Sequence, residues 1–138
     1  MRVLSSVLLL ATLCVAGAAA AEEARLVESI NAYRGEVQRC GSKASEELPP
    51  LTADSRLNLP VGAAGDLQDA LSRAGYPMVT VQAITLSGPR DAQAAMQALR
   101  ESFCRVILDP QFTDIGVSRE GRDWRIVVAR PLLDGRLG

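Results

Sequence analysis

The stretch DPQFTDIGV at residues 109–117 joins a helical segment to a β-hairpin. Its leading Asp-Pro pair ends a helix, because the residue before a proline disfavours the α region. Residues 112–118 and 124–129 are rich in β-branched and aromatic types, and residues 120–122, which include a glycine, lie between them at a turn. The stretch therefore predicts a hairpin of two strands at the end of the fold.

The segment of residues 23–40 is predicted to be one long helix. Apolar residues recur at steps of four and three between residues 23 and 40, which is typical of one helix face. They are Leu26, Ile30, Tyr33, Val37 and Cys40. Gly41 then supplies the C-terminal stop. The pattern predicts that Cys40 faces the core.

A loop and a shorter helix follow. Residues 42–65 contain several prolines and glycines and allow only a short helical turn near residues 54–59. Asp66 is a good N-cap for a helix that ends at Gly75.

A strand and a second long helix complete the order of elements before the hairpin. Residues 78–86 form a β-branched run, and Pro89 suits the first turn of a helix that continues to Leu108. We therefore expect an α+β fold, an α-β-α sandwich whose helices cover a small, mostly antiparallel sheet.

Length and composition limit the classes of protein that remain. The chain has 138 residues, 48% of them hydrophobic, which predicts one compact domain over residues 22–138. It has no histidine, which excludes a Ser-His-Asp triad, a Cys-His dyad and any zinc site that uses imidazole. Its net charge of -1 argues against a nucleic-acid partner.

The first 21 residues are typical of a secretory signal peptide. One basic residue, Arg2, precedes an apolar stretch that ends in a run of alanines suited to cleavage near residue 21. We expect a secreted or periplasmic protein without a stable membrane anchor after cleavage. The alternative is a retained transmembrane anchor, because residues 3–21 carry no charge and approach spanning length.

Cleavage removes Cys14 and leaves Cys40 and Cys104 in an oxidising compartment. A disulfide between these two cysteines is the leading prediction. Two free buried thiols are the alternative.

Several stretches in order resemble the CAP superfamily, the cysteine-rich secretory, antigen 5 and pathogenesis-related-1 (SCP-like) fold, in a compact bacterial form. Residues 109–117 resemble the family's Asn/Asp-Pro-x-Phe-Thr-Glu/Asp-Val/Ile-Gly-Val segment, and residues 30–34 and 48–57 resemble its first helix and the entry to its second. The positions that carry the motif are Asn31, Arg34, Asp109, Pro110, Phe112, Thr113, Asp114, Gly116 and Trp124.

The resemblance also implies a divalent metal held by two histidines and acidic residues, and this chain departs from that pattern. Phe103 stands before Cys104 where one histidine is expected, and Gln82 stands where members usually have a glutamate. A phenyl ring and a neutral amide do not charge-balance zinc. We therefore expect no metal, no cofactor and no catalytic residue.

Two groups of residues are open to a functional and a structural interpretation. Tyr76, Gln82 and Phe103 are candidates for a ligand cleft, but each is more simply explained by packing or by bonding to backbone. Four arginines of the hairpin are either a solvated rim or a contact for anionic envelope lipid or polymer. They are Arg119, Arg122, Arg125 and Arg130.

The sequence thus predicts an exported, non-catalytic binding or interaction module of the cell envelope, whose partner is an unknown envelope protein or a lipid or apolar ligand. One alternative is a carboxylate-dependent hydrolase of an envelope polymer, although no acidic pair stands out. Another is a small-lipid carrier lined by Met78, Ile84 and Phe103.

Overall fold

The computed structural model describes residues 21–63 and 65–132. The signal peptide predicted at residues 1–21 lies almost wholly outside these ranges. Within the described residues, no helix combines the length and the apolar character that crossing a membrane requires.

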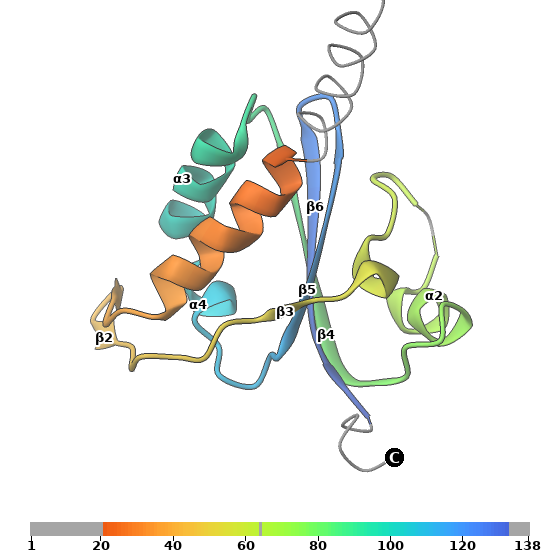
Figure 1. Cartoon of the computed structure of the whole chain (residues 1–138), viewed down its shortest axis with the longest axis horizontal. Helices are drawn as coiled ribbons and strands as arrows, with labels where there is room; N and C mark the ends of the chain where they lie inside the picture. Colours follow the sequence, from red (N-terminus) through yellow and green to blue (C-terminus); the bar gives the residue numbers. More distant parts are fainter. Residues whose placement is uncertain (1–20, 64, 133–138) are drawn as a thin grey trace, which may run out of the picture.

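A four-stranded sheet forms the middle layer (Figure 1). Its order is β3 (Thr52–Ala53), β5 (Asp114–Glu120), β6 (Asp123–Pro131) and β4 (Met78–Ser87), and only the β3–β5 pair is parallel. The hairpin predicted from residues 109–129 is therefore the centre of the sheet. Its turn contains Gly121 at φ 62°, a conformation that favours glycine.

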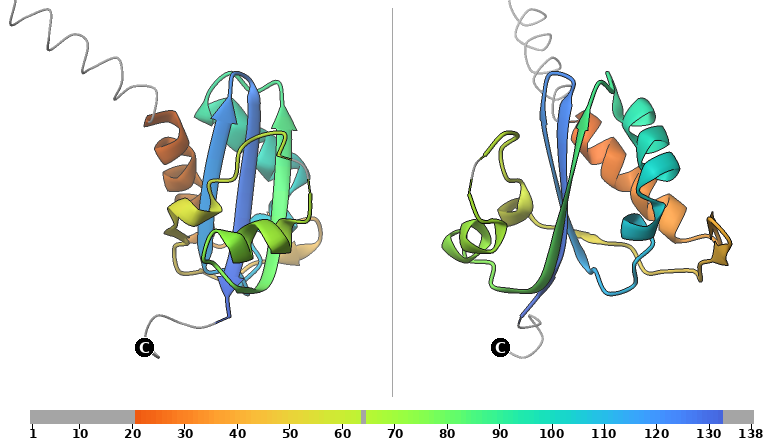
Figure 2. Two further views of the ribbon diagram at one scale, coloured as in Figure 1. Left: turned by 90° about the vertical axis from the view of Figure 1, so that its right-hand side faces the viewer. Right: turned by 180° about the vertical axis from the view of Figure 1, so that it is seen from behind.

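Helices lie on both faces of the sheet, as Figures 1 and 2 show. The helix of residues 21–34, α3 (Ala92–Ser102) and α4 (Cys104–Ile107) cover one face. The short helix η1 (Ser55–Leu57) and α2 (Leu67–Arg73) cover the other. The predicted α+β sandwich is confirmed.

The sheet has one apolar cluster on each face, and strand β6 contributes side chains to both. Trp124, Ile126 and Val128 point into the larger cluster under α3, whereas Val127 and Ala129 point into the smaller cluster under α2. Successive side chains of a strand alternate between faces, so a strand covered on both faces is a nearly continuous apolar run.

The first helix is shorter than predicted. It ends at residue 34, and Arg39–Cys40 and Lys43–Ala44 form a small antiparallel hairpin, β1–β2. The backbone N–H of Ser45 donates to the Gln38 carbonyl at 2.7 Å, so the hairpin uses backbone groups that a longer helix would have used. Val37 is consequently 64% exposed rather than part of an apolar stripe, and Gly41 serves the hairpin turn.

The helix predicted over residues 89–108 is two helices. Asp91, not Pro89, begins α3, because its carboxylate accepts from the Ala94 N–H at 2.9 Å. The helix breaks at Phe103, which has a φ of -133°, and α4 restarts at Cys104. Cys104, which forms the disulfide with Cys40, is the first residue after this break.

Candidate functional site

The buried guanidinium of Arg34 organises the loop that follows α4. Its side chain is 1% exposed and donates to four backbone carbonyl oxygens. These belong to Pro49, Ile107, Asp109 and Phe112, at 2.7 to 3.5 Å. Burial lowers the pKa of Arg34, and the nearby carboxylate of Asp109 opposes that shift. One side chain therefore joins the first helix to two loops.

Asn31, one helical turn before Arg34, fixes the adjoining segment. Its amide nitrogen donates to the Leu51 carbonyl at 3.1 Å, and its amide oxygen accepts from the Leu51 N–H at 2.8 Å. This two-way bond sets residue 51 immediately before β3. Asn31 and Arg34 thus bond to the backbone of neighbouring loops. This explains why two polar side chains of the first helix point toward the protein interior.

The remaining motif positions serve the sheet and its ends. Phe112 and Trp124 are buried in the larger cluster, and the Trp124 indole donates to the Pro89 carbonyl at 2.8 Å. The Thr113 backbone bonds to both Thr52 and Ala129, and Pro110 is exposed. A side chain at Gly116 would collide with the backbone of Leu57.

The predicted disulfide between Cys40 and Cys104 is present, with 5.8 Å between the two Cα atoms. It joins the β1–β2 hairpin to the start of α4. The hairpin consists of two short strands that pair only with each other, so this covalent link holds it against the rest of the fold.

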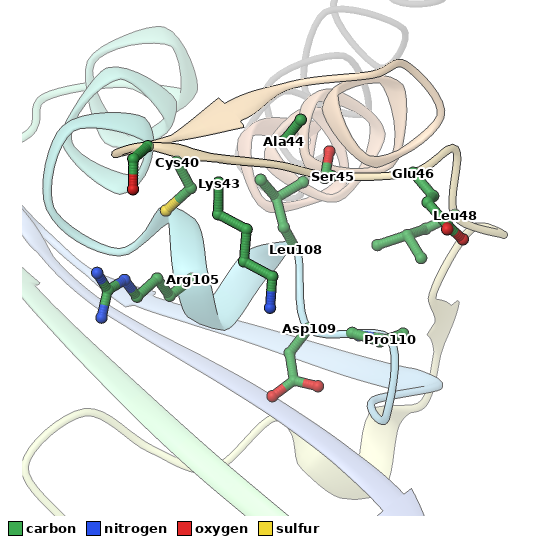
Figure 3. A pocket seen from close by; sticks show the side chains of 11 residues that line it. Cys40, Lys43, Ala44, Ser45, Glu46, Leu48, Arg105, Leu108, Asp109 and Pro110 are labelled. Carbon is green, nitrogen blue, oxygen red and sulfur yellow. The ribbon is translucent and has the colours of Figure 1, made fainter.

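Beside the disulfide lies an open groove of about 800 Å³ (Figure 3). We call it the hairpin groove. The β1–β2 hairpin and the following residues form one wall, and α4 and the Asp109–Pro110 turn form the other. It is lined by Cys40, Ser42, Lys43, Ala44, Ser45, Glu46, Leu48, Arg105, Leu108, Asp109 and Pro110.

The polar side chains are distributed unevenly along the hairpin groove. In the view of Figure 3, Arg105 lies on the left, Lys43 points down toward the Asp109 carboxylate, and Glu46 and Leu48 lie to the right of Leu108. The ion pairs between described residues are Glu22–Arg25, Asp54–Arg56 and Asp69–Arg73. Neither Lys43 nor Arg105 therefore forms an ion pair in the part of the chain that the structure describes, although Glu46 and Asp109 line the same groove.

The structure does not bring the predicted cleft residues together. Tyr76 is 1% exposed in the smaller cluster, whereas Phe103 packs against the larger cluster on the opposite face. Gln82 is exposed on β4, two positions from Ile84 and hence on the face of the larger cluster. The residues suggested for a lipid cavity are separated in the same way, because Met78 belongs to the smaller cluster.

Tyr76 takes part in a polar cluster that the sequence did not predict. Its hydroxyl donates to the Asp114 carboxylate at 2.5 Å, and the Arg56 guanidinium stacks 4.9 Å above its ring. Arg56 also makes a two-pronged contact with Asp54 at 2.9 and 2.6 Å, which lowers the pKa of Asp54. Burial, and then the bond to Asp114, raise the pKa of Tyr76. The pairings span up to 38 positions, and no local spacing points to them.

The hairpin arginines differ in their surroundings. Arg119 stacks 4.6 Å from the Trp124 ring and donates to the Arg90 carbonyl, and Arg125 donates to the Pro60 carbonyl at 3.1 Å. These two arginines hold loops on opposite faces of the sheet. Arg122 and Arg130 are exposed.

The residues present do not fit the divalent metal that the family resemblance implies. Phe103 offers no donor atom, and exposed Gln82 offers one neutral amide. Within residues 21–63 and 65–132, no three side chains of the types that bind metals are grouped together.

Comparison with known proteins adds one finding. No family model and no curated protein matches the chain. Its structure is similar to the crystal structure of an extracellular protein containing an SCP domain from Bacillus anthracis str. Ames, with a TM-score of 0.53 and 20% identity. The chain has an SCP-like fold. This confirms the predicted resemblance at the level of the fold. The match covers 60% of this chain and 34% of that protein, so the chain spans about a third of its length.

Proposed function

We propose that this chain is an exported, non-catalytic binding module with an SCP-like fold that lacks the family's metal-binding histidines, and that the hairpin groove is its contact surface. The observation that carries the proposal is the groove itself. Two cations line it that form no ion pair with any described residue, and the Cys40–Cys104 disulfide holds its wall in place. A preformed wall loses less conformational entropy on binding than a flexible one.

Three features support export. Residues 1–21 have the pattern of a signal peptide, and a disulfide is stable in an oxidising compartment. The solved SCP-domain protein of similar fold is extracellular.

A binding role rather than catalysis is supported by the chemistry of the side chains. The chain has no histidine to act as a general base near neutral pH. The carboxylates of Asp54 and Asp114 are both engaged in hydrogen bonds, with Arg56 and Tyr76.

A carboxylate-dependent hydrolase is the second candidate, because this polar cluster does bring two acids near one arginine. It predicts that Asp54→Asn or Asp114→Asn abolishes the release of soluble fragments from isolated envelope polymer. Equal release by the wild type and both variants, or none by the wild type, argues for the binding module.

Site-specific photo-crosslinking in the producing cells tests the binding module. The photoreactive p-benzoylphenylalanine replaces Ser42 in the hairpin groove or, as a matched control, exposed Ser72 on α2 at the other face of the fold. We expect a discrete adduct, identified by mass spectrometry, at position 42 and none at position 72. Equal adducts at both positions, or none at position 42, would overturn the groove as the contact surface.

Native mass spectrometry of chain exported with its own leader checks the rest of the proposal. We expect the mass of residues 22–138 less two hydrogens, without bound metal. An uncleaved mass contradicts export by a cleaved leader, and a stoichiometric metal contradicts the loss of the metal site.

A further inference from the structure

The hairpin groove is positively charged at one end, in a protein that is acidic overall. Lys43 on β2 and Arg105 on α4 both line this end, and both are exposed. Lys43 is the only lysine among 138 residues, in a chain of net charge -1. Two elements that are far apart in the sequence thus place two cations in one groove.

The carboxylate of Asp109 also lines the groove, below the Lys43 ammonium in the view of Figure 3. The two carboxylate oxygens of Asp109 accept from the backbone N–H and the side-chain amide of Gln111, at 3.0 and 2.8 Å. The buried guanidinium of Arg34 adds a positive charge close to the same carboxylate. Among the described residues, Lys43 and Arg105 form no ion pair, and Arg34 lies beside the one acid at this end, so both cations can contact a ligand.

The other end of the groove is lined by an acidic side chain and by apolar side chains. Glu46 is exposed there and its carboxylate is able to accept hydrogen bonds, and Leu48 and Pro110 offer apolar surface. A ligand with a single kind of polar group would match only one end. A ligand with an anion at one end and hydroxyl donors at the other would match both.

We propose that the hairpin groove binds a small polyhydroxylated anion, such as a sugar acid or a sugar phosphate, with its carboxylate or phosphate held between Lys43 and Arg105. The planar fork of arginine suits either oxoanion, and the ammonium of Lys43 adds a movable point charge. The hydroxyl groups of the ligand donate to Glu46, and its C–H face lies against Leu108. A groove of about 800 Å³ falls within the range of pockets that hold small ligands. This inference rests on the proposed function and names the ligand of the same groove.

The single lysine makes a direct test possible. Reductive methylation with carbon-13 formaldehyde labels Lys43 and the α-amino group only, and it keeps the positive charge. Glucuronate and glucose 6-phosphate are titrated into the labelled exported chain, with glucose and inorganic phosphate as controls. We expect a saturable shift of the Lys43 methyl resonance with one or both sugar anions. The response to glucose or to phosphate alone is expected to be at least about tenfold weaker, since each lacks half of the contacts.

Variants separate a site from general attraction of anions. We expect Arg105→Gln to weaken binding by about tenfold or more, the loss expected for one charge-assisted hydrogen bond. The matched control is Arg122→Gln, which removes an exposed charge from the β5–β6 turn and should leave the affinity within a factor of about two. Lys43→Gln and Lys43→Arg lack the labelled lysine, so their ligand binding is measured by ligand-detected saturation transfer. Lys43→Arg keeps the positive charge and Lys43→Gln removes it.

Each outcome decides the inference. Loss of binding in Lys43→Gln and Arg105→Gln, with retention in Arg122→Gln and Lys43→Arg, supports it. The absence of a saturable shift at ligand concentrations up to about 10 mM overturns it, because a specific site with a Kd of about 1 mM would be nearly saturated there. Equal losses in all the charge-removing variants overturn it too. If crosslinks form at position 42 but no sugar anion binds, the ligand class is wrong and the binding module stands.

Discussion

The Arg34 guanidinium donates to the Ile107 carbonyl oxygen at 2.7 Å, across 73 positions of the chain. The two residues belong to the first helix and to α4, which cover the same face of the sheet. The contact lies next to the Asp109–Pro110 turn, so it also sets one wall of the hairpin groove. The motif position Arg34 therefore links the fold to the candidate site.

Replacing Arg34 is expected to destabilise the fold strongly. Arg34→Met removes a donor from four carbonyl oxygens, of which that of Asp109 still accepts from the Phe112 N–H. Buried acceptors left unpaired cost about 1–3 kcal/mol each, so we expect a total loss of about 3 kcal/mol or more. Arg34→Lys should lose less but still fail to reach all four oxygens. Urea unfolding measures both. The control Arg100→Lys, on the exposed side of α3, should change stability by less than about 0.5 kcal/mol.

Gly116 should not tolerate a side chain. A Cβ atom there would collide with the backbone of Leu57, which cannot move without displacing η1 from β5. We expect Gly116→Ala to destabilise by about 1–3 kcal/mol, as overpacking does. Gly35→Ala is the matched control, because its Cβ would be no closer than 3.4 Å to other atoms. That change should stabilise slightly, by about 0.4–1 kcal/mol. Equal effects of the two substitutions in thermal unfolding would contradict the close approach.

Strong local patterns explain which elements were predictable. The apolar runs of β4 and β6 and the Gly121 turn identify three strands directly. Strands β1, β2 and β3 have only two residues each, too few for an alternating pattern. Their positions depend on distant partners, such as the bond from the Thr52 N–H to the Thr113 carbonyl.

The candidate site was less predictable than the fold, for the same reason. The cysteine pair could be predicted from the signal peptide and the cysteine count, and it lies beside the hairpin groove. Lys43 and Arg105 give no local signal, since Lys43 is a single cation in a polar loop and Arg105 a single cation in an apolar stretch. The structure does not assemble the proposed cleft, because Tyr76 and Phe103 lie on opposite faces of the sheet. The spacing of residues does not show on which face each connecting segment packs.

Removing the disulfide should destabilise the fold and loosen the groove wall. The disulfide restricts the unfolded chain, and for a separation of 64 residues its removal lowers the free energy of unfolding by about 4 kcal/mol. The double variant Cys40→Ala with Cys104→Ala should therefore unfold at a lower denaturant concentration than the wild type. Amide exchange should rise at residues 38–45 more than in β4 or β6, because the small hairpin pairs only with itself. The matched control is reductant, which should destabilise the wild type and leave the double variant unchanged. Unaltered exchange at residues 38–45 would show that the hairpin holds without the bond.

The Tyr76–Asp114 bond should make stability fall at alkaline pH. Burial raises the pKa of Tyr76 above its ordinary value of 10.0, and the bond to Asp114 raises it further. The stabilising contribution is therefore complete below pH 10, where the unfolded chain keeps its phenolic proton, and is lost as the pH rises toward the higher pKa of the folded state. The loss should follow a slope of about 1.4 kcal/mol per pH unit, the value for one proton.

Comparison with Tyr76→Phe at each pH isolates this proton, because all other groups titrate in both proteins. The variant should be less stable at pH 8, and the difference should shrink between pH 10 and pH 11. A difference that stays constant over this range would contradict the raised pKa, and with it the buried bond to Asp114.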